Sequence, residues 1–166
     1  SDAYAKAGVA QGAADSAVAG LVRALGAIKL DRPSAQVPLP GHYASVVKID
    51  ERTGIALSTD GVGTKLVIAE EMNRFDTVGI DCVAMNVNDV ICVGAEPLAM
   101  LDYVAIDRAN AEACEQIGIG LARGATLAGI EIPGGELAQL GEMVHGVDVS
   151  GACFGTVALD EIIDGS

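Results

Sequence analysis

Residues 58–66, Ser-Thr-Asp-Gly-Val-Gly-Thr-Lys-Leu, combine side chains that bind metal ions with side chains that bind phosphate. A carboxylate can hold a divalent cation, and glycines let the backbone approach phosphate oxygens closely. The candidate ligands in this segment are Asp60, Gly61, Gly63, Thr64 and Lys65. The spacing differs from the GxxxxGK[ST] pattern of a P-loop. A plain glycine turn with a solvated acid and lysine fits the same residues equally well.

Asp89 is a second candidate, because it lies in residues 76–93, which are apolar nearly all round. This pattern predicts a largely buried helix that begins at Asp76. An ionised Asp in such a helix must be paired, hydrogen-bonded or metal-bound. Asp89 could instead cap or bridge a neighbouring loop, and Asp81 could lie on the exposed edge. If Asp60 and Asp89 are functional, we expect them to face one cleft and share a cation.

Two weaker candidates follow later in the chain. Pro133-Gly-Gly-Glu136 is interpreted as a turn that presents one carboxylate, although turns of two glycines that end in an acid are common. His145 is more typical of a loop residue than of a catalyst. No Ser/His/Asp or Cys/His arrangement indicates covalent catalysis, so Lys65 and His145 are the only candidate catalytic side chains.

The elements that must position these residues are predicted from periodicity. We expect a hairpin over residues 45–49 and 54–58, helices over 76–93 and 108–128, and strands over 98–106 and 153–158. This order indicates an α+β two-layer sandwich: a four-stranded mixed sheet with helices on one face.

The strands carry apolar residues without clean alternation, as at Val46, Val47 and Ile49, and again at Phe154 and Val157. A solvated face would alternate apolar and polar residues. We therefore expect the face opposite the helices to be covered by a second copy, giving a homodimer through the sheet.

The N-terminal part, residues 1–41, is rich in Gly and Ala and then in Pro, and is expected to be a separate segment from the domain over 42–166. Within it, residues 16–25 predict a helix capped by Asp15 or Ser16. Pro33, Pro38 and Pro40 predict an extended loop.

Composition restricts the partners. The formal charge is −13 and aromatic residues make up 3%, so binding to nucleic acid or to an anionic membrane surface is not expected. The four cysteines are scattered in apolar contexts, without the ligand spacing of a zinc site. Such thiols are typical of a reducing compartment, so we expect a cytoplasmic protein.

Taken together, STDGVGTKL, FDTVGIDCVAMNVNDVICVGAEPLAMLDYVA, the GGE segment and the closing EIIDGS resemble the aminoimidazole ribonucleotide synthetase family. Members of this family are phosphoribosylformylglycinamidine cyclo-ligases of purine synthesis. The resemblance covers most of residues 42–166, which look like the N-terminal, dimerising domain. Family members carry a second domain after this segment, and we expect the 166 residues alone not to complete the reaction.

The resemblance implies ATP-dependent ring closure of formylglycinamidine ribonucleotide, a small phosphorylated substrate, with Mg²⁺. It implies Asp60 and Asp89 as Mg²⁺ ligands. It also implies residues 61–65 and Gly135 as nucleotide contacts, and Glu136 as a further acid at the phosphates and a metal ligand. It also implies that residues 1–41 contain a nucleotide lid. Two alternatives stay open: another ATP-using enzyme of the superfamily (formylglycinamidine ribonucleotide synthetase, thiamine-monophosphate kinase or selenophosphate synthetase type), or a non-catalytic dimeric domain.

Overall fold

A computed structural model of the chain describes residues 11–166. Contacts divide the chain into two units, Ser1–Ser34 and Ala35–Ser166. In the first unit, helix α2 spans Gln11–Leu25. The expected caps were wrong, because Asp15 and Ser16 lie inside this helix. Residues 1–10 of the expected nucleotide lid lie outside the described part.

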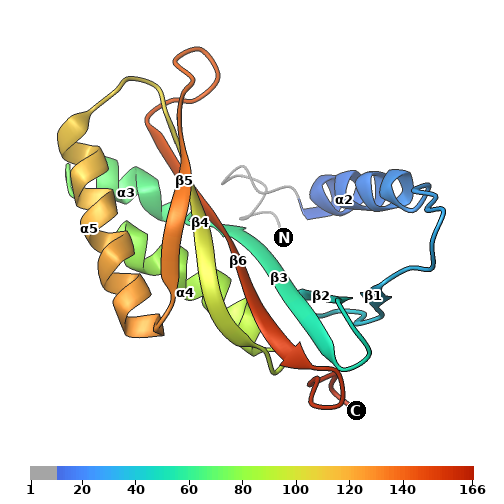
Figure 1. The fold of residues 1–166 in the computed structure, drawn as a ribbon. Helices are drawn as coiled ribbons and strands as arrows, with labels where there is room; N and C mark the ends of the chain where they lie inside the picture. The colour runs from blue at the N-terminus through green and yellow to red at the C-terminus, as the bar shows by residue number, and fades with distance from the viewer. Residues whose placement is uncertain (1–10) are drawn as a thin grey trace. The chain divides into compact units, whose positions relative to one another are not determined.

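The second unit is built on one mixed sheet, which confirms the expected α+β class (Figure 1). The sheet has six strands, where four were expected, in the order β1-β2-β3-β6-β4-β5. The strands are β1 (Gln36–Val37), β2 (Ser45–Lys48), β3 (Thr53–Gly61), β4 (Glu96–Ile106), β5 (Glu131–Gln139) and β6 (Val147–Ala158). Only β4 and β5 pair in parallel.

The two additional strands are β1 and β5. β1 has only two residues, in a segment whose prolines indicated an extended loop. β5 contains the Gly-Gly-Glu residues that were interpreted as a turn, so that interpretation was wrong. Two glycines in sequence are typical of turns, and only the parallel pairing with β4 makes them a strand.

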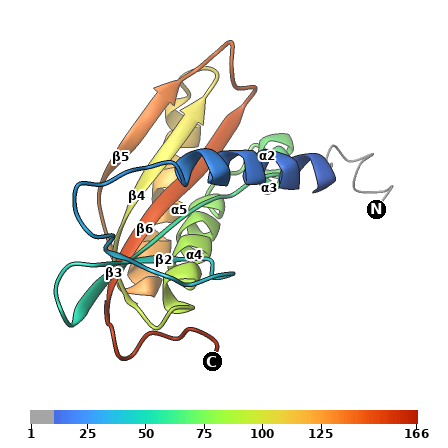
Figure 2. The same ribbon diagram turned by 90° about the vertical axis from the view of Figure 1, so that its right-hand side faces the viewer.

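Three helices cover one face of the sheet: α3 (Lys65–Glu71), α4 (Val78–Ile91) and α5 (Ala111–Ala128). Figures 1 and 2 show α4 and α5 side by side on the same side of the sheet. α5 begins where the Asn110 side chain accepts a hydrogen bond from the Ala113 N–H and ends at Gly129, which has a φ of 69°. α4 begins after Thr77 rather than at Asp76, because the Asp76 carboxylate instead pairs with Arg74 at 2.8 Å.

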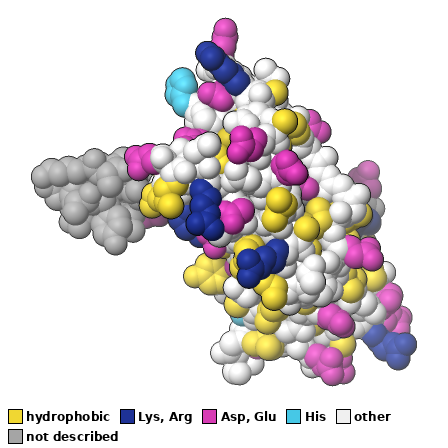
Figure 3. All heavy atoms as spheres, turned by 90° about the vertical axis from the view of Figure 1, so that its left-hand side faces the viewer, with side chains coloured by type: hydrophobic (Ala, Val, Ile, Leu, Met, Phe, Trp, Pro, Cys, Tyr) yellow, Lys and Arg dark blue, Asp and Glu magenta, His cyan; other side chains and the backbone are white. Residues whose placement is uncertain are grey.

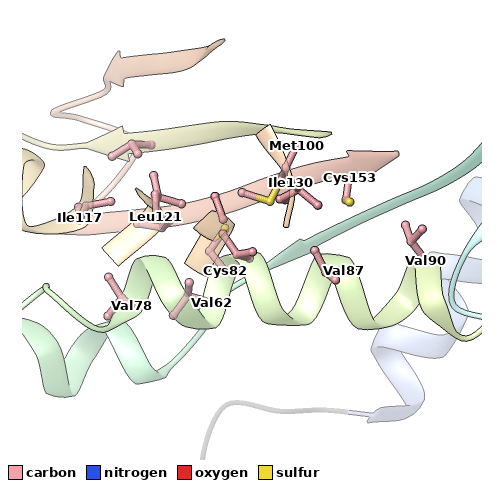
Figure 4. Close-up of a cluster of buried hydrophobic side chains, with 14 of the residues drawn as sticks. Val62, Val78, Cys82, Val87, Val90, Met100, Ile117, Leu121, Ile130 and Cys153 are labelled. Atoms are coloured by element: carbon pink, nitrogen blue, oxygen red, sulfur yellow. The ribbon is translucent and has the colours of Figure 1, made fainter. Parts of the chain in front are cut away.

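The core lies between α4, α5 and the inner face of the sheet. In Figure 4, Cys82, Val87 and Val90 of α4 point toward the strands that carry Met100 and Cys153. Burial alternates along β6, so Val157 lies on the helix side and is buried, whereas Phe154 lies on the outer face. The outer-face residues of β3, β4 and β6 remain exposed although many are apolar: Leu57, Leu101, Tyr103 and Phe154.

The surface on the side where α5 lies carries both acidic and apolar side chains. Figure 3 shows acidic side chains distributed among apolar patches on this side, rather than gathered in one place. Among residues 11–166, no helix is long and apolar enough to cross a bilayer.

Close contact between α4 and α5 depends on glycine. A Cβ on Gly79 of α4 would overlap the backbone of Gly120 and Leu121 in α5. We therefore expect Gly79→Ala to lower the free energy of unfolding by about 3 kcal/mol, because neither backbone can move away cheaply. Urea unfolding measures this change.

Gly118→Ala is the matched control, since it lies on α5 with nothing within 4 Å of the added Cβ. Alanine there should stabilise the helix by about 0.5–1 kcal/mol. Equal effects of the two substitutions would contradict the packing described.

Candidate functional site

Asp60 lies near the end of β3, at a point where α4 reaches the strand through one buried side chain. Asn86 of α4 is completely buried. Its Oδ1 accepts a hydrogen bond from the Asp60 N–H at 3.0 Å, and its Nδ2 donates to the Asp60 carbonyl at 3.2 Å. The same Nδ2 donates to the Cys82 carbonyl at 2.9 Å, within α4. Asn86 therefore fixes the Asp60 backbone to the helix.

Asp89 lies three residues further along α4 and is close enough to Asp60 for their charges to interact. The pKa of Asp89 is raised, mainly by burial and then by repulsion from the Asp60 carboxylate. Two carboxylates that repel each other favour a shared cation. The structure thus brings together the two acids that the sequence singled out.

The segment after Asp60 turns tightly into α3. The Gly61 N–H donates to the Asp60 carboxylate at 2.7 Å, and Gly63 has a φ of 70°, which only glycine adopts readily. Thr64 precedes the helix and Lys65 is its first residue. Lys65 pairs with Asp81 of α4 at 2.8 Å, with both side chains about half exposed. The expected nucleotide contacts therefore form one continuous turn.

Glu136 and Gly135 are not part of this cluster within one chain. The sheet places Asp60 opposite Gly151, Gly151 opposite Asp102, and Asp102 opposite Gly135. Three strand spacings of about 4.8 Å separate β3 from β5, or about 14 Å. Over residues 11–166, no group of three or more His, Cys, Asp or Glu residues is arranged to hold a metal ion.

His145 is exposed in the turn that precedes β6 and is outside the Asp60 cluster. Cys82 is buried between α4 and the sheet. Burial and the carboxylates of Asp102, Asp60 and Asp148 raise the pKa of the Cys82 thiol to about 12. A thiol that stays protonated at neutral pH is a poor nucleophile.

Sequence reasoning did not assign Asn86 and Asp102 to the site. Each interrupts an apolar pattern, Asn86 at the four-residue spacing of Cys82 and Val90, and Asp102 in the middle of an apolar strand. That interruption is the only local signal for either residue. Burial raises the pKa of Asp102, which lies on the helix side of the sheet in the same row as Asp60.

The fold is that of a domain shared by several larger enzymes. Thiamine monophosphate kinase from Aquifex aeolicus superposes with a TM-score of 0.61 at 16% identity, over 89% of this chain and 44% of that one. T. maritima PurL, solved as a complex with ATP, superposes with a TM-score of 0.63 at 17% identity, over 76% of this chain and 22% of that one.

Residues 41–157 match the model of the AIR synthase related protein, N-terminal domain, and the chain belongs to this family. It is 46% identical over 162 residues to the phosphoribosylformylglycinamidine cyclo-ligase of Methanocaldococcus jannaschii, over 98% of this chain and 45% of that protein. It is 50% identical over 125 residues to the cyclo-ligase of Methanosarcina barkeri, over 75% of this chain and 37% of that protein. The chain thus spans less than half the length of these relatives.

The contacts of Asn86 lead to a stability prediction. Asn86→Ala should lower the free energy of unfolding by about 2–3 kcal/mol, because the Asp60 N–H and the buried carbonyls lose their partner. Amide hydrogen exchange at Asp60 should accelerate at the same time. Asn88→Ala, on the exposed side of the same helix, should change stability by less than about 0.5 kcal/mol. Unchanged exchange at Asp60 in Asn86→Ala would contradict the assigned role.

Proposed function

We propose that this chain is the nucleotide-binding part of a phosphoribosylformylglycinamidine cyclo-ligase and that it binds ATP with Mg²⁺ at the Asp60–Asp89 cluster. The observation that carries the proposal is that Asp89 lies close enough to Asp60 for the Asp60 charge to raise its pKa, beside the effect of burial. Asn86 holds the backbone of Asp60 in place. The relatives at 46% and 50% identity are named as cyclo-ligases, which supports the choice of reaction.

The donor set fits Mg²⁺. In proteins Mg²⁺ is commonly held by one or two carboxylates together with substrate phosphates and water, not by a complete cage of side chains. Asp60 and Asp89 provide two carboxylates, and the described residues contain no larger cluster. The bound ion would supply charge neutralisation at the phosphoryl oxygens.

The chain's own residues have distinct parts in this proposal. Asp60 and Asp89 hold the cation, while the turn from Gly61 to Thr64 approaches the phosphates with its backbone. Lys65 offers an ammonium group whose position is fixed by Asp81. His145, exposed and outside the cluster, has no part in this arrangement. The work of the site is therefore positioning and charge compensation, as in other phosphoryl-transfer sites.

In the reaction of the whole enzyme, ATP phosphorylates the formyl-derived amide oxygen of formylglycinamidine ribonucleotide. The ribosyl-bearing nitrogen then attacks the activated carbon, the ring closes to aminoimidazole ribonucleotide and phosphate leaves. Another ATP-using enzyme of the same fold is the second candidate. The 16–24% identity to the thiamine monophosphate kinase and PurL structures, against 46–50% to cyclo-ligases, favours the cyclo-ligase.

We propose further that two copies pair through the outer face of the sheet. Leu57, Leu101 and Phe154 are exposed there by 45%, 48% and 36%. Adjacent apolar side chains of this kind are typical of an interface and rare on the surface of a monomer. Within one chain Glu136 is too distant to serve Asp60, so we propose that it contributes to the phosphate site of a second copy.

Asp60→Asn should weaken Mg·ATP binding at least tenfold without unfolding the domain, because it removes one of the two charges that hold the cation. Isothermal titration calorimetry measures the affinity. Glu115→Gln, which removes one charge from the exposed side of α5, should leave the affinity within twofold. EDTA should abolish most of the binding to the unaltered chain. Equal affinity of Asp60→Asn and the unaltered chain would refute the metal assignment.

Leu101→Lys should convert the dimer into a monomer at micromolar concentration, because it places a charge in the apolar contact. Light scattering coupled to size exclusion measures the mass. Leu127→Lys, at a position on α5 that is 74% exposed, should remain dimeric. A monomeric unaltered chain that still binds ATP would overturn both the interface and the shared site.

A further inference from the structure

A cavity of about 600 Å³ lies between α5 and the edge of the sheet formed by β4 and β5. One wall is apolar and comes from α5, with Ile117, Leu121 and Ala125. The opposite wall comes from residues 132–137 of β5, which include Glu136, and Asp102 of β4 is also part of the lining. The volume and the mixture of apolar wall with few polar groups are typical of a small-molecule site.

Gly135 makes room for the Asp102 side chain. The neighbours of Asp102 across the sheet are Gly151 on β6 and Gly135 on β5. A Cβ on Gly135 would overlap the Asp102 carboxylate, so this carboxylate lies directly against the β5 backbone. No bulky side chain separates Asp102 from the cavity on this side.

Asp102 has no cationic partner. Among the described residues, none forms an ion pair with its carboxylate and no other side chain donates a hydrogen bond to it. Burial raises its pKa. A partly buried carboxylate that lacks a cation is destabilising by itself, and such groups occur preferentially at functional sites.

We propose that this cavity binds a small planar amidinium group, with its two parallel N–H donors on the two oxygens of Asp102 and the remainder of the ligand against α5. The geometry of a carboxylate matches two parallel N–H donors, as in carboxylate–guanidinium pairs. The choice of an amidine rests on the proposed function, since the substrate of that reaction is a glycinamidine. The site itself, a cavity whose lining includes the unpaired Asp102 carboxylate, is independent of it.

Asp102 and Asp60 lie in the same row of the sheet, two strands apart, or about 10 Å. Gly151, between the two acids, is covered by Asn86 and Cys82 of α4. The lining of the cavity contains no residue of α4 and does not include Asp60, so the cavity is separate from the Asp60 cluster.

The test is a titration of the ¹⁵N-labelled chain with acetamidine, followed by amide chemical shifts. Saturable shifts are expected at Gly134, Gly135 and Leu121, whereas neutral acetamide should bind at least fivefold more weakly. Asp102→Asn should weaken acetamidine binding at least fivefold, and Glu131→Gln, which removes a charge from an exposed position of β5, should change it by less than twofold. The absence of saturable shifts, or equal binding by Asp102→Asn, would overturn the proposal.

A second pair of variants keeps the test valid if Asp102→Asn does not fold. Gly135→Ala should displace the carboxylate and reduce binding, whereas Glu131→Ala, on the same strand but outside the cavity lining, should not. Equal binding by these two variants would count against the site.

A parallel titration with Mg·ATP separates this proposal from the proposed function. Nucleotide shifts at Asp60 and Gly61 without acetamidine shifts would refute the cavity site alone. Acetamidine shifts without nucleotide binding would support the cavity site and refute the proposed function.

Discussion

The side chain of Asn86 is the contact on which the arrangement of the site depends. β2 pairs with β3 only as far as Leu57, so the last residues of β3 extend beyond it toward α4. There Asn86 binds both the N–H and the carbonyl of Asp60, while the Ser58 hydroxyl donates to the Asn86 carbonyl at 2.8 Å. A buried amide with all its hydrogen-bonding groups paired specifies one geometry, because any shift would leave a polar group unpaired in the core.

Because Asn86 is on α4, the position of that helix determines the positions of several site residues. Asp81, five residues earlier, pairs with Lys65, and Asp89, three residues later, lies close enough to Asp60 for their charges to interact. The position of α4 is fixed in turn by its glycine contact with α5, where the two backbones meet at Gly79 and Gly120. Packing between the helices therefore determines where the charged groups lie.

The sequence predicted what depends on local pattern and missed what depends on distant contacts. Local patterns predicted the helix α4, the hairpin of β2 and β3, and the amphipathic helix α5. They also singled out Asp60 and Asp89, because each is a charged residue in apolar surroundings. β5 could not be predicted, because its two glycines form a strand only when β4 lies beside them. The partners of Asn86 and the neighbours of Asp102 are likewise far away in the chain.

One row of residues across the sheet combines the packing of the helices with the placement of the acidic groups. Its members are Asp60, Gly151, Asp102 and Gly135. Elsewhere the inner face of the sheet is filled by Val, Met and Cys side chains that contact α4. In this row carboxylates alternate with glycines, and a Cβ on Gly151 would come within 3.0 Å of the Asn86 amide and 2.8 Å of the Met100 sulfur. The glycine thus lets α4 approach closely enough for Asn86 to reach Asp60. Gly135 in the same way leaves room for the Asp102 carboxylate beside β5. The two glycines therefore permit the contact of Asn86 with the Asp60 backbone and the position of Asp102.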